Sequence, residues 1–177
     1  ISGIDVDSTG RAYLTGYTTS FGANDFPTTA ANRFAAADTA SADAFLTRLS
    51  ASGASLEYST AIGTDGNGAN DGSDYASAVA VGADGIAFIT GSSRTGAGTD
   101  FPLKNQYEGR NGQCCYGLDL FVAKFDTNAA GNASLLYSTL IGGSGYESGD
   151  AIAVDADGNA VIGGTSEGAT GEKYDFT

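Results

Sequence analysis

The sequence contains no histidine, methionine or tryptophan, and only two cysteines and two prolines. Without histidine, neither a Ser-His-Asp nor a Cys-His catalytic arrangement can be built, and zinc lacks its usual nitrogen ligand. No apolar run approaches the roughly 18 residues that a membrane helix needs, so we expect no membrane insertion. Only eight Lys and Arg stand against 21 Asp and Glu, a net charge of −13. Because such a surface repels nucleic acids, no nucleic-acid partner is expected.

The residues that are abundant are typical of β-structure. The 177 residues include 27 glycines, which together with Ser, Thr, Asp and Asn favour tight turns. Tyr, Phe, Val, Ile and Thr fill the stretches between the turns and favour strands. The first residue is isoleucine and no signal peptide is recognisable. We therefore expect a processed chain or an excerpt of a longer one.

The sequence repeats itself with a period of about 75 residues. The clearest marker is an Asp-Phe-Pro triplet, which starts at Asp25, recurs at Asp100 and begins again at Asp175. Longer segments repeat around it: 4–16 matches 79–91 and 152–164, 43–49 matches 119–125, and 56–63 matches 136–142. The chain therefore divides into two whole units, 1–73 and 74–148, and the start of a third, 149–177.

Each unit predicts four antiparallel strands joined by glycine-bearing turns. The first strand of each unit is expected at 3–7, 78–81 and 151–155, and the second at 12–18, 87–92 and 160–165. The third strand is expected at 44–50 and 120–126, and the fourth at 55–62 and 135–141. The inner strands carry apolar or small side chains on both faces, which suits sheets that are covered on both sides. Four-stranded antiparallel units that repeat and pack face to face are the blades of a β-propeller. We predict an all-β fold of about two and a third such units, an open or partial propeller.

Aromatic residues recur at matched positions of the predicted strands. Phe45 matches Phe121 in the third strands, and Tyr58 matches Tyr137 in the fourth. Because aromatic side chains bury large areas, we predict that these four pack between blades and do not form a ligand platform. The phenylalanine of each Asp-Phe-Pro triplet is expected to anchor the long loop between the second and third strands.

The repeated segments resemble the SBBP repeat, a family named for a seven-bladed β-propeller. The motifs that carry the resemblance are Ile152-Ala153-Val154-Asp155, Gly158-Asn159, Tyr13-Leu14-Thr15-Gly16, Asp100-Phe101-Pro102, 119–124 and 136–139. The resemblance covers most of the chain. It implies an exported or cell-surface bacterial protein, often large and multidomain. It implies no catalytic residues, because the residues of the family pattern are structural.

One glycine-rich loop is the main candidate for a metal site. Within ten residues it holds five oxygen-bearing side chains, those of Asp65, Asn67, Asn70, Asp71 and Asp74. Calcium prefers six to eight hard oxygen ligands, so the loop is a candidate for a calcium cofactor. The spacing does not fit an EF-hand, since Ala69 stands where a ligand is expected. An ordinary polar loop is the alternative.

The two cysteines, Cys114 and Cys115, are adjacent in the long loop of the second unit. Neighbouring Cα atoms lie about 3.8 Å apart, which is below the usual disulfide range of roughly 4.4 Å and above. A bond between them would be strained, yet it could stiffen the loop. Disulfides to neighbouring chains and two free thiols are the alternatives.

These features favour an extracellular or cell-surface structural or interaction module that is not an enzyme. About two and a third units cannot close a ring of four to eight blades, so the expected partners are other blades of a longer chain or other copies of this one. A head-to-tail contact that does not close would give a filament. Two alternatives stay open: an adhesive propeller that binds a glycan through the loops at 105–116, and a fragment of an exported hydrolase or lyase with carboxylates at the mouth of the ring.

Overall fold

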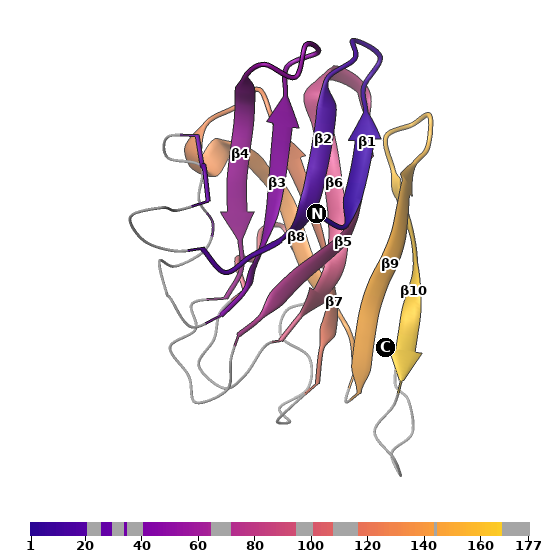
Figure 1. The fold of residues 1–177 in the computed structure, drawn as a ribbon. Helices are drawn as coiled ribbons and strands as arrows, with labels where there is room; N and C mark the ends of the chain where they lie inside the picture. Colours follow the sequence, from indigo (N-terminus) through magenta and orange to yellow (C-terminus); the bar gives the residue numbers. More distant parts are fainter. Residues whose placement is uncertain are drawn as a thin grey trace.

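In the part of the chain that the structure describes, the strands form three separate antiparallel sheets (Figure 1). The computed structural model describes residues 1–20, 26–29, 34, 41–64, 72–94, 101–107, 117–143 and 145–167. The first sheet contains β1 (Gly3–Val6), β2 (Ala12–Thr18), β3 (Asp43–Leu49) and β4 (Leu56–Ile62). The second contains β5 (Asp74–Val81), β6 (Ile86–Ser93), β7 (Asp119–Asp126) and β8 (Leu135–Ile141). The third contains β9 (Tyr146–Val154) and β10 (Ala160–Glu167).

The predicted all-β class and the four-stranded antiparallel sheets are confirmed. In both complete sheets the strands lie in chain order, each hydrogen-bonded to the next, and none of the three sheets closes on itself. The helical residues in the described ranges form two short 3-10 turns, η1 (Ala83–Gly85) and η2 (Gly131–Ala133). No helix there has the length and apolar character needed to cross a membrane. The unit boundaries after residues 73 and 148 stay predictions.

The starts of β5 and β9 correct the sequence analysis. These strands begin at Asp74 and Tyr146, earlier than the predicted 78 and 151. Both strands contain a β-bulge. In β5 the pairing register shifts between Ala76 and Ala78. In β9 the extra residue lies between Gly149 and Ala151, which pair with Gly164 and Gly163 of β10. A bulge adds one residue to a strand and breaks the alternation of side chains, so a search for alternating residues stops there.

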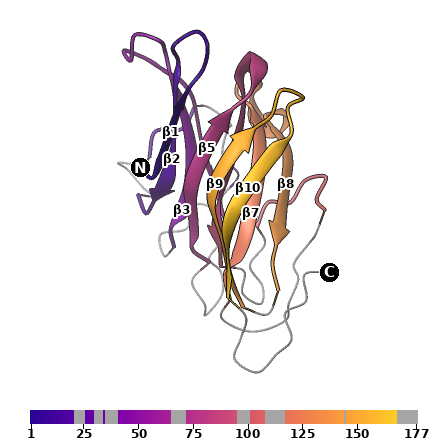
Figure 2. The same cartoon turned by 90° about the vertical axis from the view of Figure 1, so that its right-hand side faces the viewer.

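The three sheets stack face to face in layers (Figures 1 and 2). The first strand of each later sheet lies against the first three strands of the sheet before it: β5 packs on β1, β2 and β3, and β9 packs on β5, β6 and β7. The main core lies between the first and second sheets. Its largest fully buried side chains are Tyr13, Leu46, Tyr58, Ile62, Ile89, Phe121 and Phe125.

Phe26, after β2, and Phe101, after β6, make matching ring contacts with the third strand of their own sheet. The Phe26 ring lies 4.6 Å from the Phe45 ring, and the Phe101 ring lies 5.1 Å from the Phe121 ring, measured between centroids. These contacts agree with the anchoring role predicted for the first two triplet phenylalanines, and the role itself stays a prediction, because most of each long loop lies outside the described residues. The third triplet, which starts at Asp175, lies outside the described residues.

Candidate functional site: a groove beside the third sheet

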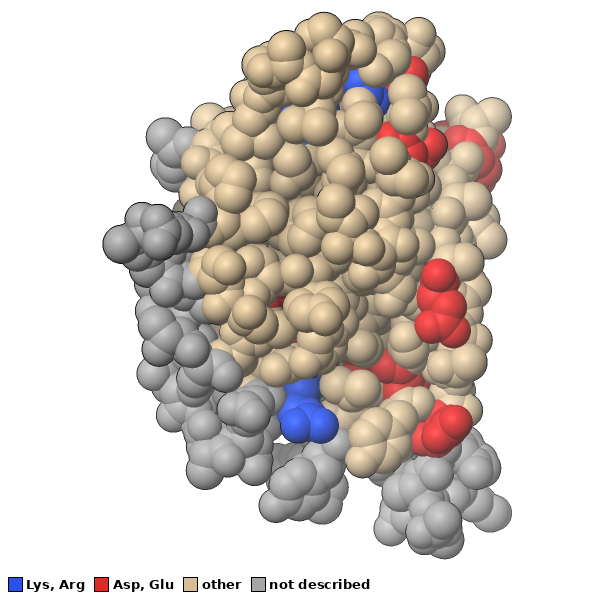
Figure 3. Space-filling view, in the orientation of Figure 1, with Lys and Arg blue, Asp and Glu red and all other residues tan. Residues whose placement is uncertain are grey.

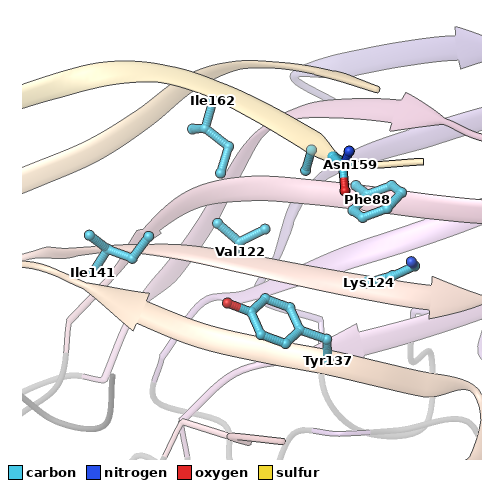
Figure 4. A pocket seen from close by; sticks show the side chains of 8 residues that line it. Phe88, Val122, Lys124, Tyr137, Ile141, Asn159 and Ile162 are labelled. Carbon is cyan, nitrogen blue, oxygen red and sulfur yellow. The ribbon is translucent and has the colours of Figure 1, made fainter. Parts of the chain in front are cut away.

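A groove lies between β10 and strands β6, β7 and β8 of the second sheet. One part has a volume of about 450 Å³, and its lining includes Phe88, Val122, Lys124, Tyr137, Ile141 and Ile162 (Figure 4). A second part, of about 540 Å³, shares Ile141 and Ile162 and continues past Leu120 to Gly164. Both volumes fall in the range of about 300–1,000 Å³ that is typical of binding pockets.

The floor of the groove is buried, and its walls are only half-buried. Phe88 and Val122 are 5% and 3% exposed and form the floor. Tyr137, Ile141 and Ile162 are intermediate in exposure. Figure 4 shows Ile162 of β10 on one side, facing Val122 and Ile141 of the second sheet across the open space. The groove is thus an apolar surface that a further apolar segment could cover.

The positive charge in the groove comes from β7. Lys124 Nζ lies 4.9 Å from the centroid of the Phe88 ring, a cation–π distance. The amide of Asn159 lies near the same end, beside Phe88, whereas the hydroxyl of Tyr137 points toward Val122 and Ile141 (Figure 4). The site therefore combines an apolar surface with a few hydrogen-bonding groups, as recognition sites do.

The groove repeats the interface between the first two sheets, position by position. The repeat alignment pairs groove residues with residues of that interface as follows: Phe88 with Tyr13, Val122 with Leu46, Lys124 with Arg48, Tyr137 with Tyr58, Ile141 with Ile62, and Ile162 with Ile89. All six equivalent residues in the first interface are buried, and five of them are only 0 or 1% exposed. The groove is thus the same kind of interface with part of its cover missing.

The first interface shows how the polar side chains of such a surface find hydrogen-bond partners when another sheet covers them. Arg48 Nη1 donates to Thr127 Oγ1 at 2.7 Å and to Asn128 Oδ1 at 2.8 Å. The Tyr58 hydroxyl donates to Ser134 Oγ at 3.1 Å. Burial raises the pKa of Tyr58 to about 12 despite this hydrogen bond. The second sheet therefore supplies hydroxyl and amide partners to Arg48 and Tyr58 of the sheet that it covers.

Two pairs of buried carboxylates lie where one sheet meets the next. A methyl group at Gly63 would lie against Asp43 Oδ1 of β3 and 2.8 Å from Asp74 Oδ2 of β5. Asp74 Oδ2 also accepts a hydrogen bond from the backbone N–H of Thr64 at 2.7 Å. A glycine is required where the two carboxylates meet, because any Cβ would occupy their space.

The second junction has the same arrangement. A methyl group at Gly142 would lie against Asp119 Oδ1 and 2.9 Å from Glu147 Oε2. Glu147 Oε2 accepts from the backbone N–H of Gly143 at 3.0 Å. The sequence analysis did not select these four carboxylates as a set. The repeat could have revealed them, since Asp43 and Asp119 begin matched segments.

The predicted calcium loop is described only at its end. Asp74 is fully buried and binds the backbone and hydroxyl of Thr64. The other four candidates, Asp65, Asn67, Asn70 and Asp71, lie outside the described residues. Among the residues that are described, no three or more Cys, Asp or Glu side chains gather in a group that could hold a metal ion. Calcium binding stays a prediction.

Cys114 and Cys115 also lie outside the described residues, so their bonding state stays a prediction. The four aromatic residues predicted to pack between blades are all described. Tyr58 and Phe121 are buried in the core between the first two sheets, Phe45 is buried beneath Phe26, and Tyr137 lines the groove.

Comparisons with known proteins leave the family of this chain open. No protein-family model matches the sequence, and no curated protein matches it significantly. The resemblance to the SBBP repeat therefore stays a prediction. The function has to be argued from the geometry of the stacked sheets.

Proposed function

We propose that this chain is a structural and interaction module of an exported bacterial protein, in which propeller-type blades associate with further blades through the end faces of the stack. Its extracellular or cell-surface location rests on the resemblance to the SBBP repeat. Its association with other blades rests on the exposure of its end faces.

The observation that carries the proposal is the difference between equivalent residues inside and at the end of the stack. Val79 of β5 is 8% exposed, because the first sheet covers it. Ile4 of β1 occupies the same repeat position and is 64% exposed. Val6, two residues further on, is 54% exposed. The outer face of the first sheet therefore presents apolar side chains of the kind that the stack buries between its sheets.

The opposite end of the stack shows the same difference. Tyr13 and Phe88 face the following sheet and are 0% and 5% exposed. Val161 of β10 holds their repeat position and is 61% exposed. The two end faces differ in kind. The outer face of the first sheet would pack against a preceding sheet, and the outer face of the third sheet would pack against a following one. A contact between unlike ends gives a ring if its rotation closes and a filament if it does not.

The distribution of charge leaves the first end face available for such a contact. Figure 3 shows few charged side chains over the first sheet, and acidic groups gathered toward the right of the view, where Figure 1 places β1, β9 and β10. Charges at the margin of an apolar surface are typical of interfaces, because water remains there after association.

Ile4→Asp tests the proposal. We expect the wild-type chain to associate as its concentration rises, and the variant to associate about tenfold more weakly because a charge would be buried at the contact. Light scattering with sedimentation measures the association, and negative-stain electron microscopy shows whether it is a ring or a filament. Ser8→Asp adds the same charge at the exposed turn after β1 and should associate like the wild type. A wild-type chain that stays monomeric at all concentrations would refute the proposal.

A further inference from the structure

The segment 101–107, which begins at the phenylalanine of the second triplet, lies along the outer edge of β8. The backbone N–H of Lys104 donates to Ser138 O at 3.2 Å, and the backbone N–H of Ser138 donates to Lys104 O at 2.9 Å. Ser138 pairs with Ala123 of β7 on its other side. This segment, called the edge strap below, therefore occupies the edge of β8 as a short fifth strand would.

The first sheet carries the same contact at the matched position. Thr29 matches Lys104 in the repeat, and Ser59 matches Ser138. The backbone N–H of Thr29 donates to Ser59 O at 3.0 Å, and the backbone N–H of Ser59 donates to Thr29 Oγ1 at 3.2 Å. Because both units place a segment on the same residue of the fourth strand, the contact belongs to the repeat and not to one loop.

Polar side chains anchor the edge strap to the start of β8. Lys104 Nζ donates to Asn132 O at 2.9 Å and also to Leu135 O. Asn105 Nδ2 donates to Leu136 O at 3.1 Å. These bonds bring side-chain donors to backbone carbonyls at the sheet edge, so the edge strap covers a longer stretch of β8 than its main-chain pairing alone.

The other end of the edge strap is buried. Phe101 is 4% exposed, and its ring lies 5.1 Å from the ring of Phe121, measured between centroids. The hydroxyl of Ser138, a fully buried residue, donates to Pro102 O. The edge strap is thus held by an apolar anchor at one end and by hydrogen bonds along the rest.

The sequence of β8 explains why this edge needs a cover. Its seven residues, Leu-Leu-Tyr-Ser-Thr-Leu-Ile, contain neither a charge nor a proline. Short segments of this composition pair readily with copies of themselves when their edge is open. The sequence of β4 is similar but has an exposed glutamate, Glu57, at its second position. A charge at an edge disfavours such pairing, so β8 depends on its cover more than β4 does.

We propose that the edge strap is an autoinhibitory contact. It occupies the hydrogen-bonding edge of β8 and so prevents β8 of a second copy of this chain from adding to the second sheet. The partner that the uncovered edge fits is that second β8, paired antiparallel about a twofold axis. This inference goes beyond the proposed function, because it concerns the edges of sheets and not the end faces of the stack.

Lys104→Pro tests whether the edge strap can be released, because proline lacks the N–H that pairs with Ser138 O and lacks the ammonium group. Amide hydrogen exchange followed by NMR measures the release. The Ser138 amide should exchange at least about tenfold faster than in the wild type. Tyr107→Pro places proline at a 73% exposed position of the same segment and should change this rate less than about twofold. Unchanged exchange in a folded Lys104→Pro chain would overturn the inference.

Thermal melting followed by circular dichroism shows whether the variants fold. If Lys104→Pro does not, a chain with both Lys104→Ala and Asn105→Gly replaces it. This chain loses three side-chain hydrogen bonds and keeps the main-chain pair. Glycine also adopts the positive φ of 50° at residue 105 without strain. The Ser138 amide should then exchange about threefold faster or more, and an unchanged rate would count against the inference as before.

Sedimentation then measures whether the uncovered edge associates. Each chain is compared with and without Ile4→Asp, which weakens contact between end faces. In the Ile4→Asp background, Lys104→Pro should strengthen association at least about tenfold. The Ser138 amide should become slow again at concentrations where copies associate, because the second β8 replaces the edge strap. A released edge strap without stronger association would refute the autoinhibitory role.

The same chains distinguish a failure of this inference from a failure of the proposed function. A wild type that stays monomeric, together with a Lys104→Pro variant that associates, would contradict the association of end faces and support the edge strap. Association that Ile4→Asp weakens and Lys104→Pro leaves unchanged would do the reverse. A gain from Lys104→Pro that Ile4→Asp abolishes would mean that copies meet through their end faces, and the inference would fail.

Discussion

Asp7 and Asp155 show how single side chains fix the hairpin turns of this protein. Asp7 Oδ1 accepts hydrogen bonds from the backbone N–H groups of Thr9 and Arg11 at 2.9 and 3.0 Å, and Arg11 Nε lies 2.7 Å from Asp7 Oδ2. Asp155 Oδ1 accepts from the backbone of Asn159 at 2.8 Å in the same pattern. Burial opposes ionisation of Asp7, but these hydrogen bonds outweigh it and hold the pKa of its carboxyl well below 3.8. Hydrogen bonds, led by those from Asn159, likewise lower the pKa of Asp155.

Asp7→Asn should therefore destabilise the protein in a pH-dependent way. A carboxyl whose folded pKa is lowered stabilises the fold above its unfolded value of 3.8, and this contribution is lost as the pH falls through the lowered folded pKa. We expect a melting temperature about 2–4 °C below the wild type at pH 7, with a difference that shrinks below about pH 4. Asp157→Asn removes the same charge from an exposed turn position and should have little effect. A difference that is constant from pH 7 to pH 2 would contradict the assigned role of the carboxyl.

The strands of this protein combine a bulge with a facing glycine. In the second and third sheets, the first strand carries an extra residue, and the second strand places Gly91 or Gly164 beside it. A methyl group on Gly91 would overlap the backbone oxygen of Tyr75, and one on Gly164 would overlap that of Ser148. The bulge therefore requires glycine for backbone clearance.

Gly91→Ala should accordingly be among the most disruptive small substitutions in the chain. Its Cβ would meet backbone atoms of the adjacent strand, which move only if the sheet distorts, and we expect a loss of about 2–4 kcal/mol in the free energy of unfolding. Gly163→Ala is the matched control. It lies next to Gly164, and its added Cβ would have nothing within 4 Å. Denaturant unfolding should show little change for the control, and equal losses for both variants would contradict the explanation.

The stack as a whole has one sheet that packs against a neighbouring sheet on both faces and two that pack on one face only. The second sheet is packed on both faces, by the first sheet and by the third. The end faces expose apolar residues such as Ile4 and Val161, while the chain carries a net charge of −13. In the association that we propose, apolar contact between end faces favours binding, and the like charge of the molecules opposes it.

Salt should shift this balance toward association. At about 0.5 M salt the screening length falls to a few ångströms, so repulsion between the acidic molecules weakens while apolar contact is retained. We expect the association constant measured by sedimentation to rise between about 0.05 M and 0.5 M sodium chloride. Weaker association in high salt would show that ion pairs, and not apolar faces, hold the molecules together.

Much of the local structure could be predicted because it depends on near neighbours in the chain. Alternation of side chains and glycine-bearing turns predicted the strands of the first two sheets, and Gly10, Gly85 and Gly158 adopt positive φ values of 84°, 79° and 81° in the turns. The bulges beside Ala76 and Gly164 could not be predicted, because they interrupt the alternation that reveals a strand. Predictions for the loop at 65–71 and for Cys114 and Cys115 stay untested.

The groove depends on relations that no local pattern contains. The amino-acid order alone establishes that Ile162 and Ile89 are equivalent, and that Tyr137 repeats Tyr58. It does not establish that Tyr58 is covered while Tyr137 is half-exposed, since that difference depends on how much of each following sheet lies across it. Strand-forming tendency acts over a few residues, whereas the cover of a side chain comes from segments many tens of residues away. For that reason the repeat could be found by comparing letters, and the open interface appeared only once the sheets were stacked.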